Sequence, residues 1–369
     1  MKILLLTTSL EIGGAEKQVC ELADRFVENG HQVRIVSLTG KTLLRPYNES
    51  IEILELNSSK TILGLVRALY LCIKWIREFR PDIFHSHMVH ANIFSRIIKV
   101  FFISTPLICT AHSINEGGRA RTLAYRYTDF LSDLNTNVSQ EAVELYIKKG
   151  ICKSHKIRSV CNGIDINRFK FSPVYRDNKR KQIELDNNEI LLLAVGRLTE
   201  AKDYPNLINA FEYLTNSSPI KVRLVIIGDG ELKNSLIDLV YQKKLEDSVL
   251  FLGAISDVDK WMSAADIFVM SSEWEGLPLV LLEAMSSERF VVATDCGGIK
   301  KLIENNGEVV PIKDSYQLFE ALLKCVNMSD NQRSMVGESA RERIINNFSS
   351  CAISEQWISI YREQIEAKA

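Results

Sequence analysis

Two glutamates separated by seven residues are the first candidates for chemistry in this sequence. Glu275 and Glu283 lie in the stretch EWEGLPLVLLEA, where the residues between them are apolar, glycine or proline. Burying an unpaired carboxylate in such company costs several kcal/mol, so a partner must compensate the second one. Proline is favourable at the first position of a helix, because its missing N–H is not needed there. We expect a helix from about Pro278 through Met285, with Glu275 in the loop before it and Glu283 inside it.

The start of this helix suits a phosphorylated sugar. Free N–H groups and the helix dipole favour an anion at a helix N-terminus, and Gly276 lets the backbone turn closely in front of it. The two carboxylates would accept hydrogen bonds from neutral hydroxyl groups. Sugar, phosphate and sugar together describe a nucleotide sugar. The structural alternative is that Glu283 pairs with a core Arg or Lys and that Glu275 merely caps the helix.

A glycine and two cations follow a buried strand in EILLLAVGRLTEAKDYPNL. Gly196, Arg197 and Lys202 would lie in a strand-to-helix loop at the carboxyl end of a sheet, where open α/β folds bind ligands. The two cations could neutralise a diphosphate there. The alternative is a solvated loop, which is the usual role of a lone Arg or Lys.

The first half of the chain has an equivalent loop, EIGGAEKQ, with Gly13 and Gly14. Glycines there let the backbone approach a ligand, and the alternative is a tight turn alone. The motif is not G-x-G-x-x-G, so the nicotinamide fingerprint is absent.

Histidines are the remaining candidates. His112 ends a buried strand at the edge of the sheet where a ligand would bind. The alternative to a role at the substrate is that its imidazole only makes hydrogen bonds to backbone groups. His85, His87 and His90 could be imagined around a metal ion. No cysteine or carboxylate at ligand spacing accompanies them, so we predict no metal site.

Alternating strands and helices must position these residues. Apolar strands separated by helices imply a parallel sheet covered on both faces. The pattern restarts near Glu189, after a charged stretch, Asp177–Lys181, that looks like a connection between domains. In the first half we expect a helix ending at Asn29-Gly30 and a helix over Leu63–Phe79, with strands over Lys2–Thr8, Val33–Leu38, Ile83–His87 and Leu107–Ala111.

The bulk properties describe an ordinary globular protein of 369 residues, long enough for two domains. A net charge of -1 and a pI of about 6.6, without a long basic run, disfavour nucleic acid as a partner. The N-terminal leucine run is too short for a secretion signal, and no run reaches the length that spans a bilayer. Eight cysteines without a C-x-x-C pair fit reduced thiols in a cytosolic protein.

Six motifs follow one another along nearly the whole chain. They are GGAE at 13–16, TAHS at 110–113, NGID at 162–165, GR with Lys202, GDG at 228–230 and E-x7-E at 275–283. In this order and spacing they resemble the retaining glycosyltransferases of family 4. The resemblance implies the GT-B architecture, an α/β fold of two Rossmann-like doubly wound domains that face a cleft. It implies an N-terminal acceptor-binding domain over 1–170, a nucleotide-sugar-binding domain over 171–345 and a C-terminal helix, 346–369, that packs back on the first domain.

The same resemblance implies roles for single residues. Arg197 and Lys202 would hold the donor diphosphate, Glu283 the ribose hydroxyls and Glu275 the transferred sugar. The Gly276-Leu277 backbone would lie near the phosphates. The remaining donor contacts would be Gly13 and Gly14 of the first-domain loop, together with Gly196, Gly228 and Asp229. His112 would line the reaction centre, which makes His112, Arg197, Lys202 and Glu275 the catalytic candidates.

The implied activity is transfer of a hexose or N-acetylhexosamine, with retention, from a nucleotide-diphosphate sugar, expected to be UDP-linked. The expected acceptor is a glycan, lipid-linked in polysaccharide, O-antigen or capsule assembly, and no metal or other cofactor is expected. Two alternatives stay open. These are a nucleotide-sugar epimerase of the same architecture and a non-catalytic subunit that binds sugar nucleotides.

Two stretches bear on the acceptor, LVRALYLCIKWIREFR at 65–80 and FSRIIKVFFIS at 94–104. Both are apolar with interleaved basic and aromatic residues, which is the composition of helices that bind a membrane interface. The alternative is two ordinary helices packed on the sheet with their basic residues solvated. We expect a cytoplasmic protein, and peripheral contact with the cytoplasmic face of the membrane is a hypothesis.

Overall fold

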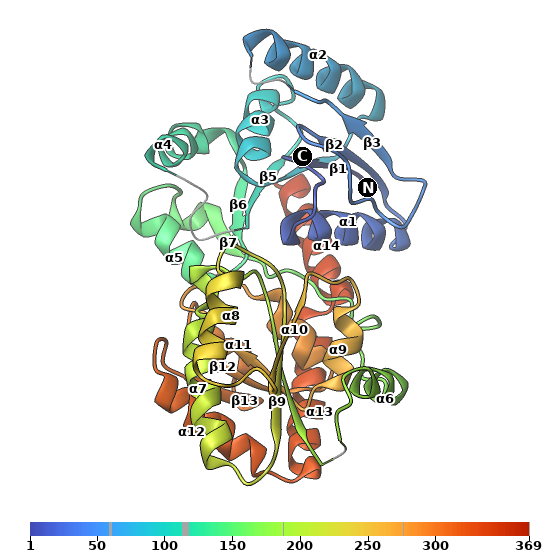
Figure 1. Ribbon diagram of the computed structural model, residues 1–369. Coiled ribbons are helices and arrows are strands. Elements are labelled where there is room, and N and C mark those ends of the chain that lie inside the picture. Colours follow the sequence, from blue (N-terminus) through green and yellow to red (C-terminus); the bar gives the residue numbers. More distant parts are fainter. Residues whose placement is uncertain (59–60, 113–117, 187, 276, 369) are drawn as a thin grey trace. The chain divides into compact units, whose positions relative to one another are not determined.

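The computed structural model describes residues 1–58, 61–112, 118–186, 188–275 and 277–368 (Figure 1). The chain forms two compact units. Unit 1 comprises Met1–Gly163 and Ser350–Ala369, and unit 2 comprises Ile164–Ser349. The first division falls inside the NGID motif at 162–165. Ile164 and Phe169 are both buried in the core of unit 2.

Unit 1 is built on a parallel sheet of seven strands in the order β3-β2-β1-β4-β5-β6-β7. The strands at Ile83–His87 and Leu107–Ala111 match their predicted bounds, the first strand ends one residue earlier than predicted, and the second begins and ends one residue earlier. The sequence reading missed β3, β6 and β7, which are short and carry polar residues. The strands are β1 (Lys2–Thr7), β2 (Gln32–Ser37), β3 (Glu52–Glu55), β4 (Ile83–His87), β5 (Leu107–Ala111), β6 (Leu134–Asn137) and β7 (Ile157–Ser159).

Helices cover this sheet. Gly30 follows α1 with a φ of +78°, the left-handed conformation expected at the Asn29-Gly30 helix end. The Thr61 side chain caps α2 by accepting a hydrogen bond from the Gly64 N–H. The helices are α1 (Gly14–Glu28), α2 (Ile62–Phe79), α3 (Val89–Lys99), α4 (Arg119–Thr128), α5 (Gln140–Lys148) and α14 (Ser350–Glu366), with single turns η1 (Asp129–Leu131) and η2 (Ser154–Lys156).

The last helix, α14, belongs to unit 1 although it follows all of unit 2 in the sequence. Figure 1 shows α14 next to α1. Trp357 and Tyr361 are buried in the same core as α1, and the Tyr361 ring lies 5.4 Å from that of Phe26. The expected single helix from about residue 346 is two helices, because extended backbone at Ser349 separates α13 from α14.

Unit 2 has a parallel sheet of six strands in the order β10-β9-β8-β11-β12-β13. The strands are β8 (Ile190–Val195), β9 (Val222–Ile227), β10 (Val249–Gly253), β11 (Ile267–Met270), β12 (Phe290–Thr294) and β13 (Gly307–Val310). The helices are α6 (Pro173–Gln182), α7 (Tyr204–Ser217), α8 (Lys233–Gln242), α9 (Val258–Ala264), α10 (Leu279–Ser286), α11 (Ile299–Ile303), α12 (Ser315–Val326) and α13 (Asp330–Phe348), with the turn η3 (Glu200–Lys202).

The interpretation of Asp177–Lys181 as an interdomain connection is wrong. These residues lie inside α6, which Ser172 caps by accepting a hydrogen bond from the Tyr175 N–H. Arg180 is buried, and its guanidinium donates to the Asp266 carboxylate at 3.0 Å and to the Glu189 carbonyl at 2.8 Å. A charged stretch can therefore pack on a domain when its charges meet buried partners.

Each sheet reverses its strand order at one place, between β1 and β4 in unit 1 and between β8 and β11 in unit 2. Open α/β sheets bind ligands outside the carboxyl ends of strands at such a switch point. Among the described residues, no helix has the length and apolar character needed to cross a bilayer.

Candidate functional site

In unit 2 the candidate residues lie at the switch point of the sheet. Gly196 and Arg197 directly follow β8, Gly228 and Asp229 follow β9, and Ser272 and Glu275 follow β11. The Arg197 side chain is exposed beside these strand ends, where it can meet an anion.

The loop after β8 is held against the loop after β9 without intervening side chains. The Gly196 N–H donates to the Ile227 carbonyl at 2.9 Å, and the Leu198 N–H donates to the Asp229 carbonyl at 3.0 Å. A Cβ on Gly228 would lie 1.9 Å from the Gly196 carbonyl oxygen, and Gly228 has a φ of +144°. Glycine at 228 is thus a structural requirement of this loop pair.

Lys202 and Glu275 form an ion pair at this edge of the sheet. The same Glu275 oxygen accepts a hydrogen bond from the Ser272 hydroxyl at 2.9 Å. The side chains of Lys202 and Glu275 retain 19% and 15% of their exposure, so both carry charge within reach of solvent. This arrangement supplies a cation for a phosphate and a carboxylate that can accept hydrogen bonds from hydroxyl groups.

The helix of the E-x7-E motif begins one residue later than predicted. Pro278 is the N-cap, with an extended ψ of 97°, and α10 starts at Leu279. Pro278 makes no side-chain capping hydrogen bond, and the Glu275 carboxylate interacts with Lys202 and Ser272. Glu283 is half-buried inside the helix and has an interaction partner. Leu277 is half-buried in the preceding loop, and Gly276 lies outside the described residues.

Asp229 is exposed, like Arg197. Its carboxylate pairs with Lys233 at 3.0 Å and accepts the Gly230 N–H at 2.8 Å, and these two interactions lower its pKa. The structure thus gives Asp229 local partners within its own loop.

The glycine loop of unit 1 leads directly into α1. Gly13 is the N-cap and Gly14 is the first helical residue. A Cβ on Gly13 would lie 2.3 Å from one carboxylate oxygen of Glu16. The other carboxylate oxygen accepts a hydrogen bond from the Ser9 hydroxyl. Glycine at 13 therefore leaves room for Glu16, and the exposed backbone of Gly14 stands at the helix N-terminus.

His112 follows β5 and contacts a second histidine that the sequence reading did not place at the site. His87 Nδ1 and His112 Nε2 lie 3.0 Å apart, and no described residue offers His87 Nε2 a hydrogen-bond partner. Burial lowers the pKa of both imidazoles, that of His112 to about 4, so both are neutral near pH 7. In neutral imidazoles one ring nitrogen donates and the other accepts, so one of these two nitrogens donates its hydrogen to the other.

The other histidines of that segment have different hydrogen-bond partners, although the His85 ring lies 4.0 Å from that of His87. His85 is fully buried between the Tyr361 hydroxyl at 2.5 Å and the Thr110 hydroxyl at 2.7 Å, while His90 is exposed. Among the described residues, no three His, Cys, Asp or Glu side chains are grouped so that they could hold a metal ion. All eight cysteines are free.

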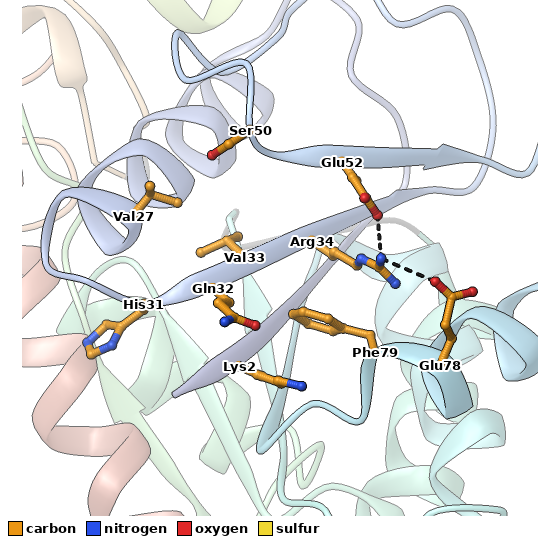
Figure 2. Close-up of a pocket in the computed structure, with 10 residues that line it drawn as sticks. All are labelled: Lys2, Val27, His31, Gln32, Val33, Arg34, Ser50, Glu52, Glu78 and Phe79. Carbon is orange, nitrogen blue, oxygen red and sulfur yellow. Dashed lines mark hydrogen bonds and ion pairs between the residues drawn. The ribbon is translucent and has the colours of Figure 1, made fainter.

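A polar pocket of about 420 Å³ lies at the opposite, amino edge of the unit 1 sheet (Figure 2). Lys2, Gln32 and Glu52 are the first residues of β1, β2 and β3. Arg34 in this pocket pairs with Glu52 at 2.6 Å and with Glu78 at 3.4 Å. Because parallel sheets bind ligands at the carboxyl edge and this cation is already compensated, we do not assign the pocket to the substrate.

Two family models cover most of the chain. The model described as Glycosyltransferase Family 4 matches residues 12–168, and the model described as Glycosyl transferases group 1 matches residues 175–343. The chain belongs to glycosyltransferase family 4. It is a glycosyltransferase with the GT-B fold.

Relatives agree with this membership. The chain is 27% identical over 297 residues to the UDP-Gal:alpha-D-GlcNAc-diphosphoundecaprenol alpha-1,3-galactosyltransferase of Escherichia coli, with 77% of this chain and 76% of that protein covered. It is 26% identical over 380 residues to a Campylobacter jejuni transferase, covering 98% and 99%. That protein is named GalNAc-alpha-(1->4)-GalNAc-alpha-(1->3)-diNAcBac-PP-undecaprenol alpha-1,4-N-acetyl-D-galactosaminyltransferase.

Solved structures share the fold. HepE from Anabaena, crystallised in complex with UDP, aligns with a TM-score of 0.85 at 24% identity, over 98% of this chain and 100% of that one. A glycosyltransferase from Rickettsia africae aligns with a TM-score of 0.87 at 21% identity, over 99% and 98%. The expectation of an α/β GT-B fold is confirmed.

Sequence reading missed Ser272 and His87 as parts of the two sites. Both side chains are buried, and only their contacts with Glu275 and His112 identify them as parts of the sites. The position of Ser272, three residues before Glu275, was an available signal.

Proposed function

We propose that the chain is a retaining glycosyltransferase that moves a hexose or N-acetylhexosamine from a UDP-sugar to a lipid-linked glycan during polysaccharide, O-antigen or capsule assembly. The main support for binding of a nucleotide-sugar donor is the Lys202–Glu275 ion pair at the switch point of unit 2, beside exposed Arg197. Cations and a hydroxyl-accepting carboxylate at that place match a diphosphate next to a sugar. The UDP bound by HepE is in line with a UDP-linked donor.

Each candidate has a role in this proposal. Arg197 and Lys202 bind the diphosphate, Glu275 accepts hydrogen bonds from the transferred sugar, and Glu283 accepts them from the ribose. Gly196, Gly228 and Asp229 form the loop pair around the diphosphate, and Leu277 offers its backbone. From unit 1, Gly13 and Gly14 supply phosphate contacts, and His112 supplies a hydrogen bond to a sugar hydroxyl.

The reaction exchanges one bond at the anomeric carbon for another. The acceptor hydroxyl oxygen forms a bond to that carbon, and the bond from the carbon to the diphosphate oxygen breaks. The diphosphate leaves with the electron pair and takes the proton of the acceptor hydroxyl. Negative charge grows on the diphosphate, so Arg197 and Lys202 stabilise the transition state more than the ground state. No metal or other cofactor is part of the proposal.

The lipid-linked acceptor is proposed from the names of two relatives, which act on diphosphoundecaprenol-linked sugars. Figure 1 shows α2 in unit 1, and this helix carries both exposed apolar and exposed basic residues. That composition suits contact with a membrane surface, so we propose peripheral association from the cytoplasmic side.

The test compares two neighbouring carboxylates. Glu275 pairs with Lys202, and Glu273 in the same loop pairs with Lys313 at 2.5 Å at a more exposed position. The Glu275→Gln and Glu273→Gln variants are assayed for release of nucleoside diphosphate from a panel of nucleotide sugars, with and without lipid-linked acceptor. We expect Glu275→Gln to lower kcat by about 100-fold or more and Glu273→Gln to leave it within about threefold.

Proton NMR of the product gives its anomeric configuration, and retention is the expected result. Full activity of Glu275→Gln would refute the site assignment. Isomerised nucleotide sugar formed without acceptor would instead identify an epimerase, and absence of both activities with every donor would favour a binding subunit.

A further inference from the structure

We propose that an apolar cavity in unit 1 holds the prenyl chain of the lipid-linked acceptor next to its diphosphate. This inference rests on the proposed function and adds a binding site for one part of the acceptor. The cavity has a volume of about 530 Å³ and is lined by Thr8, Leu38, Thr39, Ser58, Leu65, His90, Ile93, Phe94 and Ile97.

The position of the cavity is the first argument. Thr8 directly follows β1, Leu38 and Thr39 directly follow β2, and His90 lies in the first turn of α3, the helix after β4. The cavity therefore lies at the carboxyl ends of β1 and β2, beside the β1–β4 switch point of the unit 1 sheet. In open α/β sheets this is the place where ligands bind.

The chemistry of the lining is the second argument. Five of the lining side chains are apolar, and the others are hydroxyls and the titratable His90. A mostly apolar pocket of several hundred Å³ with a few polar groups is typical of small-molecule binding sites. A sugar alone would leave this apolar surface unused.

The polar and apolar groups are separated along α3. His90 is in the first turn, and Ile93, Phe94 and Ile97 follow over the next two turns, about 10 Å further at 1.5 Å per residue. Near His90, the Thr8 hydroxyl accepts the Ala91 N–H at 3.3 Å, and the Thr39 hydroxyl donates to the Thr8 carbonyl at 2.9 Å. A ligand with a polar head and an apolar chain matches this order of groups.

The apolar lining continues onto an exposed surface. Leu65 lines the cavity and is 39% exposed, and it lies on the same helix as Ile62 at 83% and Val66 at 57%. The basic residues Arg67 and Lys74 are exposed on that helix as well. An apolar chain longer than the cavity can therefore continue toward an anionic lipid surface, to which these basic residues are complementary.

The polar pocket in Figure 2 belongs to the same unit and differs from this cavity in its lining and its position. It is lined by the charged residues Lys2, Arg34, Glu52 and Glu78, and it lies at the amino edge of the sheet. Neither its position nor its lining suits a prenyl chain.

The test measures chain binding apart from turnover. Farnesyl diphosphate and isopentenyl diphosphate share a head group and differ in chain length, and their affinities for the full-length protein are measured by isothermal titration calorimetry. We expect the wild-type protein to bind farnesyl diphosphate at least tenfold more tightly. The Leu65→Gln/Ile97→Gln variant changes two partly exposed lining residues and should reduce that ratio to below threefold.

Leu123→Gln is the matched control, because Leu123 is 44% exposed on α4 and does not line the cavity. It should keep the wild-type ratio, and circular dichroism checks that all variants are folded. Equal affinity of the wild-type protein for both ligands would overturn the proposal, as would an unchanged ratio in the double variant.

Assays of sugar transfer distinguish failure of this inference from failure of the proposed function. With a water-soluble short-chain acceptor, the double variant should keep wild-type kcat while its KM for the prenyl acceptor rises at least tenfold. Loss of chain-length preference with intact transfer would refute the cavity alone. Intact preference without sugar transfer by the wild-type protein would refute the proposed function. Binding to anionic phospholipid vesicles is measured as well, and a loss of vesicle binding in the double variant with an unchanged KM for the prenyl acceptor would overturn the proposal in favour of membrane docking.

Discussion

Gly228→Ala should disrupt the donor-site loops of unit 2 through a single methyl group. Gly228 has a φ of +144°, a conformation that residues with a Cβ rarely adopt. The added Cβ would lie 1.9 Å from the Gly196 carbonyl oxygen, where ordinary contact begins at 3.4 Å. Relief of this overlap requires the loop that carries Arg197 to move away from the loop after β9.

The magnitude follows from these two effects. Backbone strain of this kind costs about 1–3 kcal/mol, and the overlap with a backbone atom brings the expected loss of unfolding free energy to about 3–5 kcal/mol. For a unit of this size that loss lowers Tm by about 6–20 °C. The displaced loop should also weaken UDP binding by at least tenfold.

Gly253→Ala is the matched control. Gly253 ends the neighbouring strand β10 with a φ of +69°, and no described atom lies within 4 Å of a Cβ placed there. Only the left-handed backbone penalty of about 1–2 kcal/mol applies, and UDP affinity should stay within twofold. Thermal unfolding by circular dichroism and calorimetric titration with UDP measure both effects. A Gly228→Ala protein that matches the wild type in Tm and UDP affinity would refute the reasoning.

Two further predictions concern stability. Burial lowers the pKa of His85, His87 and His112 below 6.5, so between pH 6.5 and about 4 the unfolded chain binds protons that the folded chain does not. The free energy of unfolding should therefore fall as the pH is lowered through this range, by about 1.4 kcal/mol per pH unit for each histidine. Urea unfolding at several pH values checks this, and a His112→Gln variant with an unreduced slope would contradict it. Asp266→Asn should destabilise unit 2 by about 3–5 kcal/mol, because the buried carboxylate accepts hydrogen bonds from Arg176, Arg180 and the Leu191 N–H. Glu308→Gln removes the exposed pair with Lys324 and should cost less than about 1 kcal/mol by the same measurement, so similar losses in the two variants would contradict the assignment.

Local sequence patterns predicted many of the helices and strands of this fold. The apolar runs at 83–87 and 107–111 became strands with the predicted bounds, because a strand covered on both faces of a sheet needs apolar residues throughout. The α2 helix and the Gly30 helix end follow from periodicity and glycine chemistry in the same way. These features depend on residues that are close together in the chain.

The elements that the sequence did not reveal depend on distant partners. From its sequence alone, Asp177–Lys181 is interpreted as a connection between domains. In the structure it lies in α6, where Arg180 donates a hydrogen bond to Asp266, far along the chain. The strand β6, with the sequence LNTN, is buried although half of its residues are asparagine. Its Asn135 donates to Asp129 and accepts from Arg96, so hydrogen bonds replace apolar burial there.

The sequence by itself indicated that Glu283, inside an apolar helix, needs a partner and that a cationic loop and a glycine loop stand at strand ends. Only the tertiary structure decided which groups meet. Lys202 reaches Glu275 across 73 residues of sequence, and Tyr361 reaches His85 across 276. The need for a partner is a property of a carboxylate in apolar surroundings and can be read from its neighbours in the chain. The pairing of Lys202 with Glu275 depends instead on the order of strands in the sheet, which brings the ends of β8 and β11 together.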